Sequence, residues 1–152
     1  MSKNNKKAGR SGVAAATKQE DLLQRPTTQL WRLAPATAFD VMALREMRAT
    51  LSTIAILEEP TWRSAAGGNA ATAIGLALRL NPARSTSIAY DLIVTALAIC
   101  AAEGNAAACI VMSHILRKLP GAGKAEHRIA TSWLVHGFSG VLSHRAETEG
   151  AA

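Results

Sequence analysis

The sequence predicts an all-helical protein with a basic tail at its N-terminus. Apolar residues make up 49% of the chain and aromatic residues only 4%. Much of the apolar content is alanine, the strongest helix former, so close helix contacts are expected in place of large core side chains. No segment alternates apolar and polar residues in the way a half-buried strand does. These observations together favour helices throughout a folded body of residues 33–145.

Residues 1–32 are expected to form a largely disordered basic tail. They hold seven Lys or Arg and two Asp or Glu, and so carry a net charge of +5 out of the chain's +6. Residues 1–20 contain almost no large apolar side chains, so burial cannot offset the entropy lost on ordering. Contacts made by this tail would be electrostatic, and the candidate residues are Lys3, Lys6, Lys7 and Arg10.

Residues 22–33 differ from the rest of the tail because they contain Leu22, Leu23, Leu30, Trp31 and Leu33. This short docking segment could pack on the body or bind a partner. Packing on the body is the preferred interpretation, since a Trp so close to a domain usually joins its core.

The first helix is predicted over residues 37–58. Thr37 and Asp40 resemble a capping box in which Asp replaces Glu. One face of this helix carries apolar residues at spacings of three and four, and Pro60 follows its end.

Four further helices are predicted, and their boundaries come from caps and breakers, over residues 64–80, 87–102, 105–119 and 124–143. Asn81-Pro82 ends the second helix, and a Ser-Thr-Ser run precedes the third. Gly104 and Asn105 separate the third helix from the fourth, and Pro120-Gly121 follows the fourth. Residues 146–152 are expected to fray into a disordered C-terminus.

The chain contains an internal repeat with an offset of 36 residues. Residues 65–71 read A-A-G-G-N-A-A and residues 101–107 read A-A-E-G-N-A-A. In each copy a Gly can end one helix with a positive φ angle, and the following Asn can cap the next helix. The repeated unit is therefore a helical hairpin of about 36 residues that must stack on a neighbour to bury its apolar face.

Residues 101–108, followed by an apolar helix and the Ala-x-x-Trp of Ala130 and Trp133, resemble the SEL-type subclass of tetratricopeptide repeats. The copy at residues 65–71, with an apolar second helix from Ile88, is similar, and the resemblance covers residues 65–140. It implies a short stack of hairpins, with the helix at 37–58 as an atypical capping element. Members of this family mostly act as adaptors that hold other proteins.

The two cysteines, Cys100 and Cys109, fall inside apolar helical segments and are expected to be buried free thiols in a reducing compartment. No metal site and no cofactor are expected, because two cysteines at this spacing do not form a zinc signature. Neither a signal peptide nor a membrane span is visible, so a cytoplasmic protein is expected.

A catalytic role is the weakest of the functional hypotheses, and the protein is expected not to be an enzyme. The four histidines, which could titrate near neutral pH, lack the i, i+4 spacing of a helical metal pair: His114, His127, His136 and His144. A helix-turn-helix interpretation of the second and third helices fails because the third helix is almost entirely apolar and cannot read base edges.

The leading hypothesis is a non-enzymatic adaptor or regulator that binds a protein partner. A second copy of the same chain is one possible partner. The first helices of the hairpins would line its groove, with five candidate contacts: Thr72, Leu76, Arg79, Met112 and Lys118. For Leu76 and Met112 the alternative is a place in the core. The second hypothesis is a nucleic-acid-associated protein that uses the basic tail.

Overall fold

The structure is a computed structural model that describes residues 26–149, and the side chains of residues 26–141. Within this range it contains seven α-helices, three short 3-10 helices and no strand, so the all-α prediction is confirmed. The elements are η1 (Thr27–Gln29), α2 (Leu30–Leu33), η2 (Ala36–Ala38), α3 (Val41–Ser52), α4 (Trp62–Ala66), α5 (Ala70–Leu78), η3 (Pro82–Arg84), α6 (Ile88–Ala102), α7 (Ala106–Lys118) and α8 (Lys124–Glu149).

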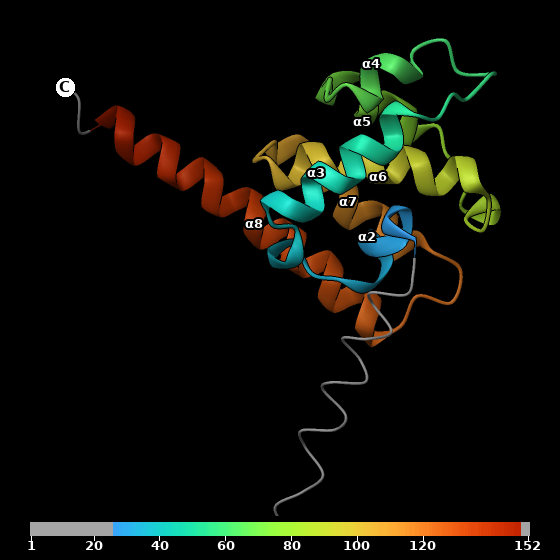
Figure 1. Ribbon diagram of the computed structural model, residues 1–152. Coiled ribbons are helices and arrows are strands. Elements are labelled where there is room, and N and C mark those ends of the chain that lie inside the picture. Colours follow the sequence, from blue (N-terminus) through green and yellow to red (C-terminus); the bar gives the residue numbers. More distant parts are fainter. Residues whose placement is uncertain (1–25, 150–152) are drawn as a thin grey trace, which may run out of the picture.

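Helix α6 is the centre of the bundle. Every residue from Tyr90 to Ala101 is buried, as expected for a helix that is apolar on all sides. Helices α3, α4, α5 and α7 and the segment that contains η1 and α2 pack around it (Figure 1). No helix within residues 26–149 combines the length and apolarity that crossing a membrane requires.

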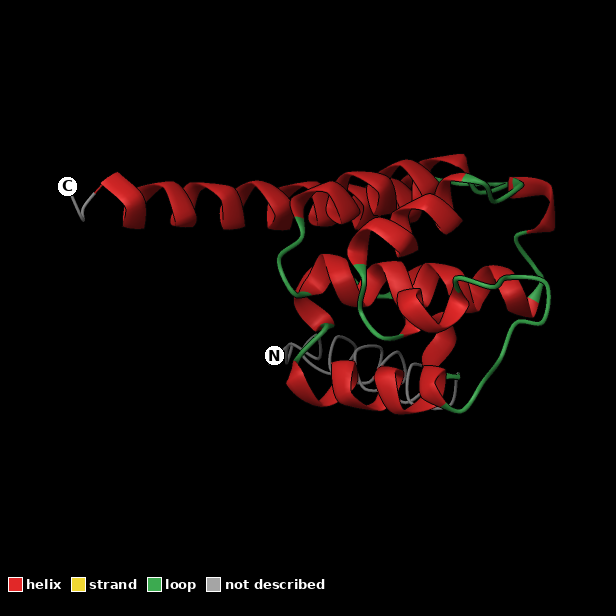
Figure 2. Cartoon of the chain, turned by 90° about the horizontal axis from the view of Figure 1, so that it is seen from above, coloured by secondary structure: helices red, strands yellow, loops and turns green. Residues whose placement is uncertain are grey.

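Helices α7 and α8 form the most extensive helix pair. Their close approach depends on Gly137, because a Cβ atom there would lie 2.8 Å from the Cβ of Cys109. Trp133 of α8 is fully buried. The C-terminal half of α8 runs past the N-terminus of α7 and projects from the bundle (Figures 1 and 2).

The chain that precedes α3 packs on the body. Trp31 is fully buried and Phe39 meets Trp133 edge to face, with ring centroids 5.0 Å apart. The backbone N–H of Ala36 donates to the Ser132 hydroxyl at 3.0 Å. Residues 1–25, which include the predicted tail contacts, lie outside the described residues.

The helix predicted over residues 37–58 is shorter at both ends. Asp40, not Thr37, is its N-cap, and its carboxylate accepts the backbone N–H of Ala43 at 2.8 Å. The helix stops at Ser52, and the Ile54 carbonyl accepts the indole N–H of Trp62 at 2.8 Å. That tertiary bond holds the chain out of the helix well before Pro60.

The prediction of a single helix over residues 64–80 is wrong, because two helices, α4 and α5, occupy this segment. Gly68 has a φ of 97°, which the right-handed helix cannot accommodate, and it separates α4 from α5.

The three later helices, α6, α7 and α8, begin where the sequence predicts. Helix α8 continues to Glu149, six residues beyond its predicted end and into the segment that was expected to fray.

The two copies of the Gly-Asn element have the same backbone structure. Gly68 and Gly104 have φ angles of 97° and 98°, and Asn69 and Asn105 each accept a cap bond from the backbone N–H three residues later. In both copies the Asn N–H also returns to the carbonyl five residues earlier, which completes a Schellman motif. Helices α5 and α7 therefore begin 36 residues apart, and so do α6 and α8.

Candidate functional site

Two of the five predicted partner contacts lie in the core. Leu76 and Met112 are 2% and 0% exposed, so neither side chain can face a groove. Both point toward the neighbouring helices because they continue the buried faces of α5 and α7. The core alternative holds for these two residues.

Thr72 and Arg79 have partners within the protein. The Thr72 hydroxyl donates to the Asn69 side chain at 3.0 Å and lies 3.3 Å from the Ser64 hydroxyl, so it completes the cap of α5. The Arg79 side chain is 65% exposed and its Nη2 lies 3.1 Å from Oε2 of Glu59. Arg79 is thus available at the surface, while Thr72 serves the fold.

Lys118 is exposed and lies beside a small hollow of about 50 Å³ between α5 and α7. Leu78 and Leu80 line this hollow from the α5 side, and His114 lines it from α7. A wider groove of about 330 Å³ shares Leu80 and Tyr90 with the hollow. Of the predicted contacts, Lys118 and Arg79 therefore border neighbouring concave surfaces.

A surface of α5 and α7 that we call the α5–α7 face carries two large apolar side chains in contact with solvent. Leu78 is 60% exposed and Ile110 is 53% exposed. Helices α5 and α7 pack against each other. Other exposed residues of these two helices lie three or four positions from Leu78 or Ile110 or from one another, and so share their side of the helix. The face consists of Ala71, Gly75, Leu78, Ala107, Ile110, His114 and Lys118.

The sequence analysis offered Leu76 and Met112 as surface positions of these helices and missed Leu78 and Ile110. Leu78 follows Leu76 by two positions and Ile110 precedes Met112 by two, which corresponds to a rotation of about 200° around a helix. In a segment as rich in alanine as this one, apolar residues occupy both sides. The pattern alone therefore does not fix which side is buried.

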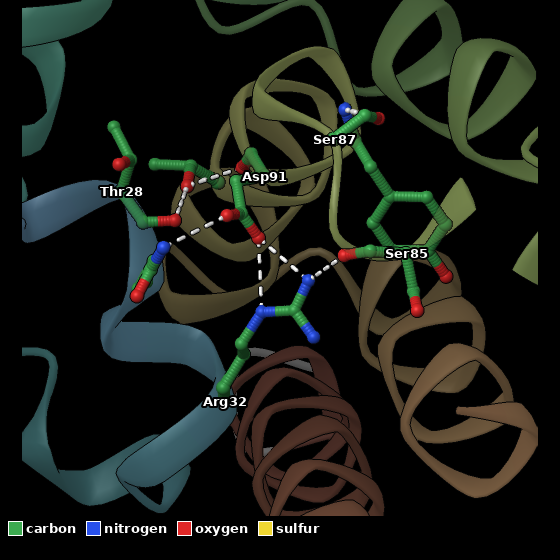
Figure 3. Close-up of polar contacts among 8 residues, drawn as sticks. Thr28, Arg32, Ser85, Ser87 and Asp91 are labelled. Carbon is green, nitrogen blue, oxygen red and sulfur yellow. Dashed lines mark hydrogen bonds and ion pairs between the residues drawn. The ribbon is translucent and has the colours of Figure 1, made fainter. Parts of the chain in front are cut away.

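A cluster of polar side chains lies where the N-terminal segment crosses α6 (Figure 3). Arg32 donates to Oδ1 of Asp91 from Nε at 2.9 Å and from Nη2 at 2.7 Å, and Nη2 also donates to the Ser85 carbonyl. Gln29 donates to the other carboxylate oxygen at 3.2 Å. The Arg32 guanidinium lies 4.2 Å from the centre of the Trp31 ring. Both carboxylate oxygens have donors, so the cluster fastens the N-terminal segment to α6.

The two cysteines are free and buried. The Cys100 thiol donates to the Gly68 carbonyl at 3.6 Å, and the Cys109 thiol donates to the Ala101 carbonyl at 3.3 Å. Burial raises the pKa of Cys109 from 9.0 to about 11, and burial together with the nearby Glu103 raises the pKa of Cys100. Both groups are therefore protonated near neutral pH, which makes them poor nucleophiles.

Three of the four histidines have described side chains, and none of these is hydrogen-bonded to a cysteine thiol. His136 is half-buried, with Nε2 at 3.2 Å from the Ala102 carbonyl and its ring edge-on to Trp133. His114 and His127 are exposed. Among the described residues no three His, Cys, Asp or Glu side chains come together as a metal site. The side chain of His144 lies outside the described residues.

The burial of α6 bears on the helix-turn-helix interpretation, in which this helix would read bases. Its side chains from Tyr90 to Ala101 are enclosed by protein and cannot enter a DNA groove. A groove of about 460 Å³ lies instead between the end of α3 and α4. Arg63 is the only charged residue that lines it.

Comparisons of this chain with protein-family models, with curated proteins and with solved structures give no match. The proposals below therefore rest on the residues themselves.

Proposed function

We propose that this protein is a non-enzymatic helical-repeat adaptor or regulator that binds a protein partner through the α5–α7 face. The observation that carries the proposal is the exposure of Leu78 and Ile110, 60% and 53%, on two helices that lie side by side. Exposed apolar side chains grouped with a few polar ones are typical of protein-binding surfaces. Both cysteines are free thiols, which supports a cytoplasmic location for this adaptor.

The repeat supports the choice of face. Helix α5 packs on α6 and α7 packs on α8, and the two pairs begin 36 residues apart, which supports an interpretation of them as two hairpins of a SEL-type tetratricopeptide stack. In a stack of such hairpins the first helix of each unit lines a continuous surface, and here those helices are α5 and α7. Helix α3, which packs on α6, would then be the capping element.

The charges near the face favour a partner segment that carries apolar and acidic side chains. Helices α7 and α8 contain four Lys or Arg and one Glu within residues 106–141. The four cations are Arg117, Lys118, Lys124 and Arg128. None of them forms an ion pair with a carboxylate among the residues whose side chains are described. Acidic groups on a partner would be attracted to this end of the molecule.

The proposal is tested with Leu78→Asp and Ile110→Asp, compared with Leu57→Asp. Leu57 is 97% exposed and lies in the loop between α3 and α4, so it provides the same chemical change away from the face. Full-length protein is used to capture partners from extract of its native cell, and the enriched protein is purified and titrated against each variant. We expect binding to fall at least tenfold for the face variants and to stay unchanged for Leu57→Asp. Equal affinity for all three variants would refute the assignment of the face.

A second candidate function is association with nucleic acid, and it is favoured by the four cations of α7 and α8, which form no ion pair among the side chains that the structure describes. They would add to the electrostatic contacts of the tail residues Lys3, Lys6, Lys7 and Arg10. Deletion of residues 1–20 separates the two functions. It should leave binding to the protein partner intact, whereas the salt-dependent affinity for nucleic acid should fall, because the four tail cations are removed.

A further inference from the structure

The small hollow between α5 and α7 contains a buried hydrogen-bond donor that no described residue uses. Tyr90 lines this hollow, and the residue is only 2% exposed. Within residues 26–141 its hydroxyl forms no hydrogen bond, and the cap of α6 uses only its backbone N–H, which donates to the Ser87 hydroxyl. A nearly buried hydroxyl without a partner is costly, so it points to a ligand that supplies the missing acceptor.

The Tyr90 hydroxyl opens toward the hollow and not into the core. The fully buried side-chain atoms without a partner are, in the described residues, the indole nitrogens of Trp31 and Trp133, so the Tyr90 hydroxyl keeps some contact with solvent. The neighbouring groove of about 330 Å³ borders Tyr90 together with Ser87 and Ile93, and thus follows the surface of α6. No other α6 residue lines the hollow, so the outer end of the Tyr90 side chain is the part that reaches it.

The polar side chains that line the hollow can all donate a hydrogen bond. Besides Tyr90 they are His114 and Lys118, which are both exposed on α7, and no Asp or Glu lies among the lining residues. Burial raises the pKa of Tyr90, so its hydroxyl keeps its proton and donates near neutral pH. The Lys118 ammonium forms no ion pair with any described carboxylate. These donors match a carboxylate, which only accepts hydrogen bonds and carries the opposite charge to Lys118.

We propose that the hollow binds the carboxylate of an Asp or Glu side chain of the protein partner that docks on the α5–α7 face. Its oxygens accept from the Tyr90 hydroxyl and the Lys118 ammonium, while its methylene carbons contact the apolar wall at Leu80 and Ile115. The volume of about 50 Å³ corresponds to a few water molecules and fits such a group. This inference rests on the proposed function, because Leu78 belongs both to the face and to the wall of the hollow.

Acetate tests the hollow in the full-length protein without any partner. Tyr90 is the only tyrosine of the chain, so the NMR signals of isotope-labelled tyrosine report on this site alone. At constant ionic strength, acetate should shift these signals saturably with a millimolar dissociation constant. Acetamide, which has the same shape but no charge and an NH₂ group in place of one oxygen, should leave them unchanged.

Two charge variants complete the acetate titration. Lys118→Gln should weaken acetate binding about threefold to tenfold, because it removes the cation from the wall of the hollow. Arg45→Gln is the matched control, since it removes one positive charge from an exposed position of α3 that does not line the hollow, and it should bind acetate as the wild type does. The absence of a saturable shift with acetate, or an equal shift with acetamide, would overturn the proposal.

The captured partner tests where the carboxylate comes from. Tyr90→Phe removes only the unpartnered hydroxyl and keeps the ring beside Trp31, with the ring centroids 6.2 Å apart, so it should unfold at no lower urea concentration than the wild type. We expect Tyr90→Phe and Lys118→Gln each to weaken partner binding about threefold to tenfold, and Arg45→Gln to leave it unchanged. Wild-type affinity of Tyr90→Phe for the partner would overturn the proposal, and together with acetate binding it would assign the hollow to a small free carboxylate.

The hollow and the face can fail separately. Ile110 belongs to the face but does not line the hollow, so Ile110→Asp reports on the face alone. Loss of partner binding in Ile110→Asp with normal binding by Tyr90→Phe would retain the face and exclude the hollow. If Ile110→Asp also binds normally, the face is refuted, while the acetate titration still decides whether the hollow takes a carboxylate.

Discussion

Arg32 and Asp91 are 59 positions apart in the sequence, and two guanidinium nitrogens of Arg32 donate to a single carboxylate oxygen of Asp91. The Asp91 side chain is 8% exposed and the Arg32 side chain 23%. Gln29 holds the second carboxylate oxygen, while Thr95 of α6 donates to the Thr28 carbonyl at 2.9 Å. The pair therefore joins the short N-terminal elements to the first turns of the central helix.

Asp91→Asn should destabilise the protein by about 2–3 kcal/mol, because it leaves the Arg32 guanidinium without its counter-charge in a mostly buried site. Urea unfolding followed by circular dichroism measures the change. Glu103→Gln is the matched control, since it breaks an ion pair with Arg48 whose side chains are 42% and 36% exposed. That surface pair should contribute less than about 1 kcal/mol. Similar losses for both variants would mean that the Asp91 cluster is no more important than an ordinary surface pair.

Two glycines should respond to alanine in opposite directions. Gly104→Ala should cost about 1–2 kcal/mol, because the φ of 98° is a conformation that L side chains rarely adopt. Gly75 lies within α5, and a Cβ atom there would meet nothing within 4 Å. Gly75→Ala should therefore stabilise the protein by about 0.5–1 kcal/mol through helix propensity. Thermal unfolding of both variants provides the comparison, and a stabilising Gly104→Ala would contradict the assigned turn.

Gly137 and Gly140 provide a second pair, three residues apart on α8. Gly137→Ala should destabilise the protein by about 1–3 kcal/mol, because its Cβ atom would lie 2.8 Å from the Cβ of Cys109 and push α7 and α8 apart. At Gly140 the nearest atom to such a Cβ is the Gly104 carbonyl oxygen at 4.0 Å. Gly140→Ala should therefore be neutral or stabilising. If urea unfolding shows equal stability for both variants, the two helices are not in tight contact at Gly137.

The sequence predicts the parts of this fold that local chemistry determines. Asn105 begins α7 through its side-chain cap, and Ser87 does the same for α6. The repeat indicates both Gly-Asn turns, although the helix predicted over residues 64–80 runs through the first of them. These features depend on a few neighbouring residues, so they can be recognised without knowledge of the rest of the chain.

Features that depend on distant residues were not predictable in the same way. The early end of α3 depends on the hydrogen bond from the Trp62 indole, which lies ten positions beyond Ser52, to the Ile54 carbonyl. The position of Arg32 depends on its ion pair with Asp91. The exposure of Leu78 and Ile110 depends on which neighbours cover α5 and α7. An alanine-rich helix can be buried on several sides, so only the assembled bundle decides which apolar residues remain available to a partner.

Alkaline pH provides a test of the burial of Cys109. Its pKa is about 11 in the folded protein, raised from 9.0 by burial. Between these two values the unfolded chain releases the thiol proton while the folded protein keeps it, so stability should fall as pH rises from about 9 to about 11. Urea unfolding at several pH values should show a shallower fall for Cys109→Ala than for the wild type. Below pH 9 the alanine variant should differ from wild type only by a constant amount, the cost of the small cavity.

At pH 8 an aromatic disulfide reagent should label the Cys109 thiol only as the protein unfolds, because Cys109 is fully buried. Rapid labelling of the folded protein, or equally steep alkaline losses for both proteins, would show that Cys109 is accessible to solvent.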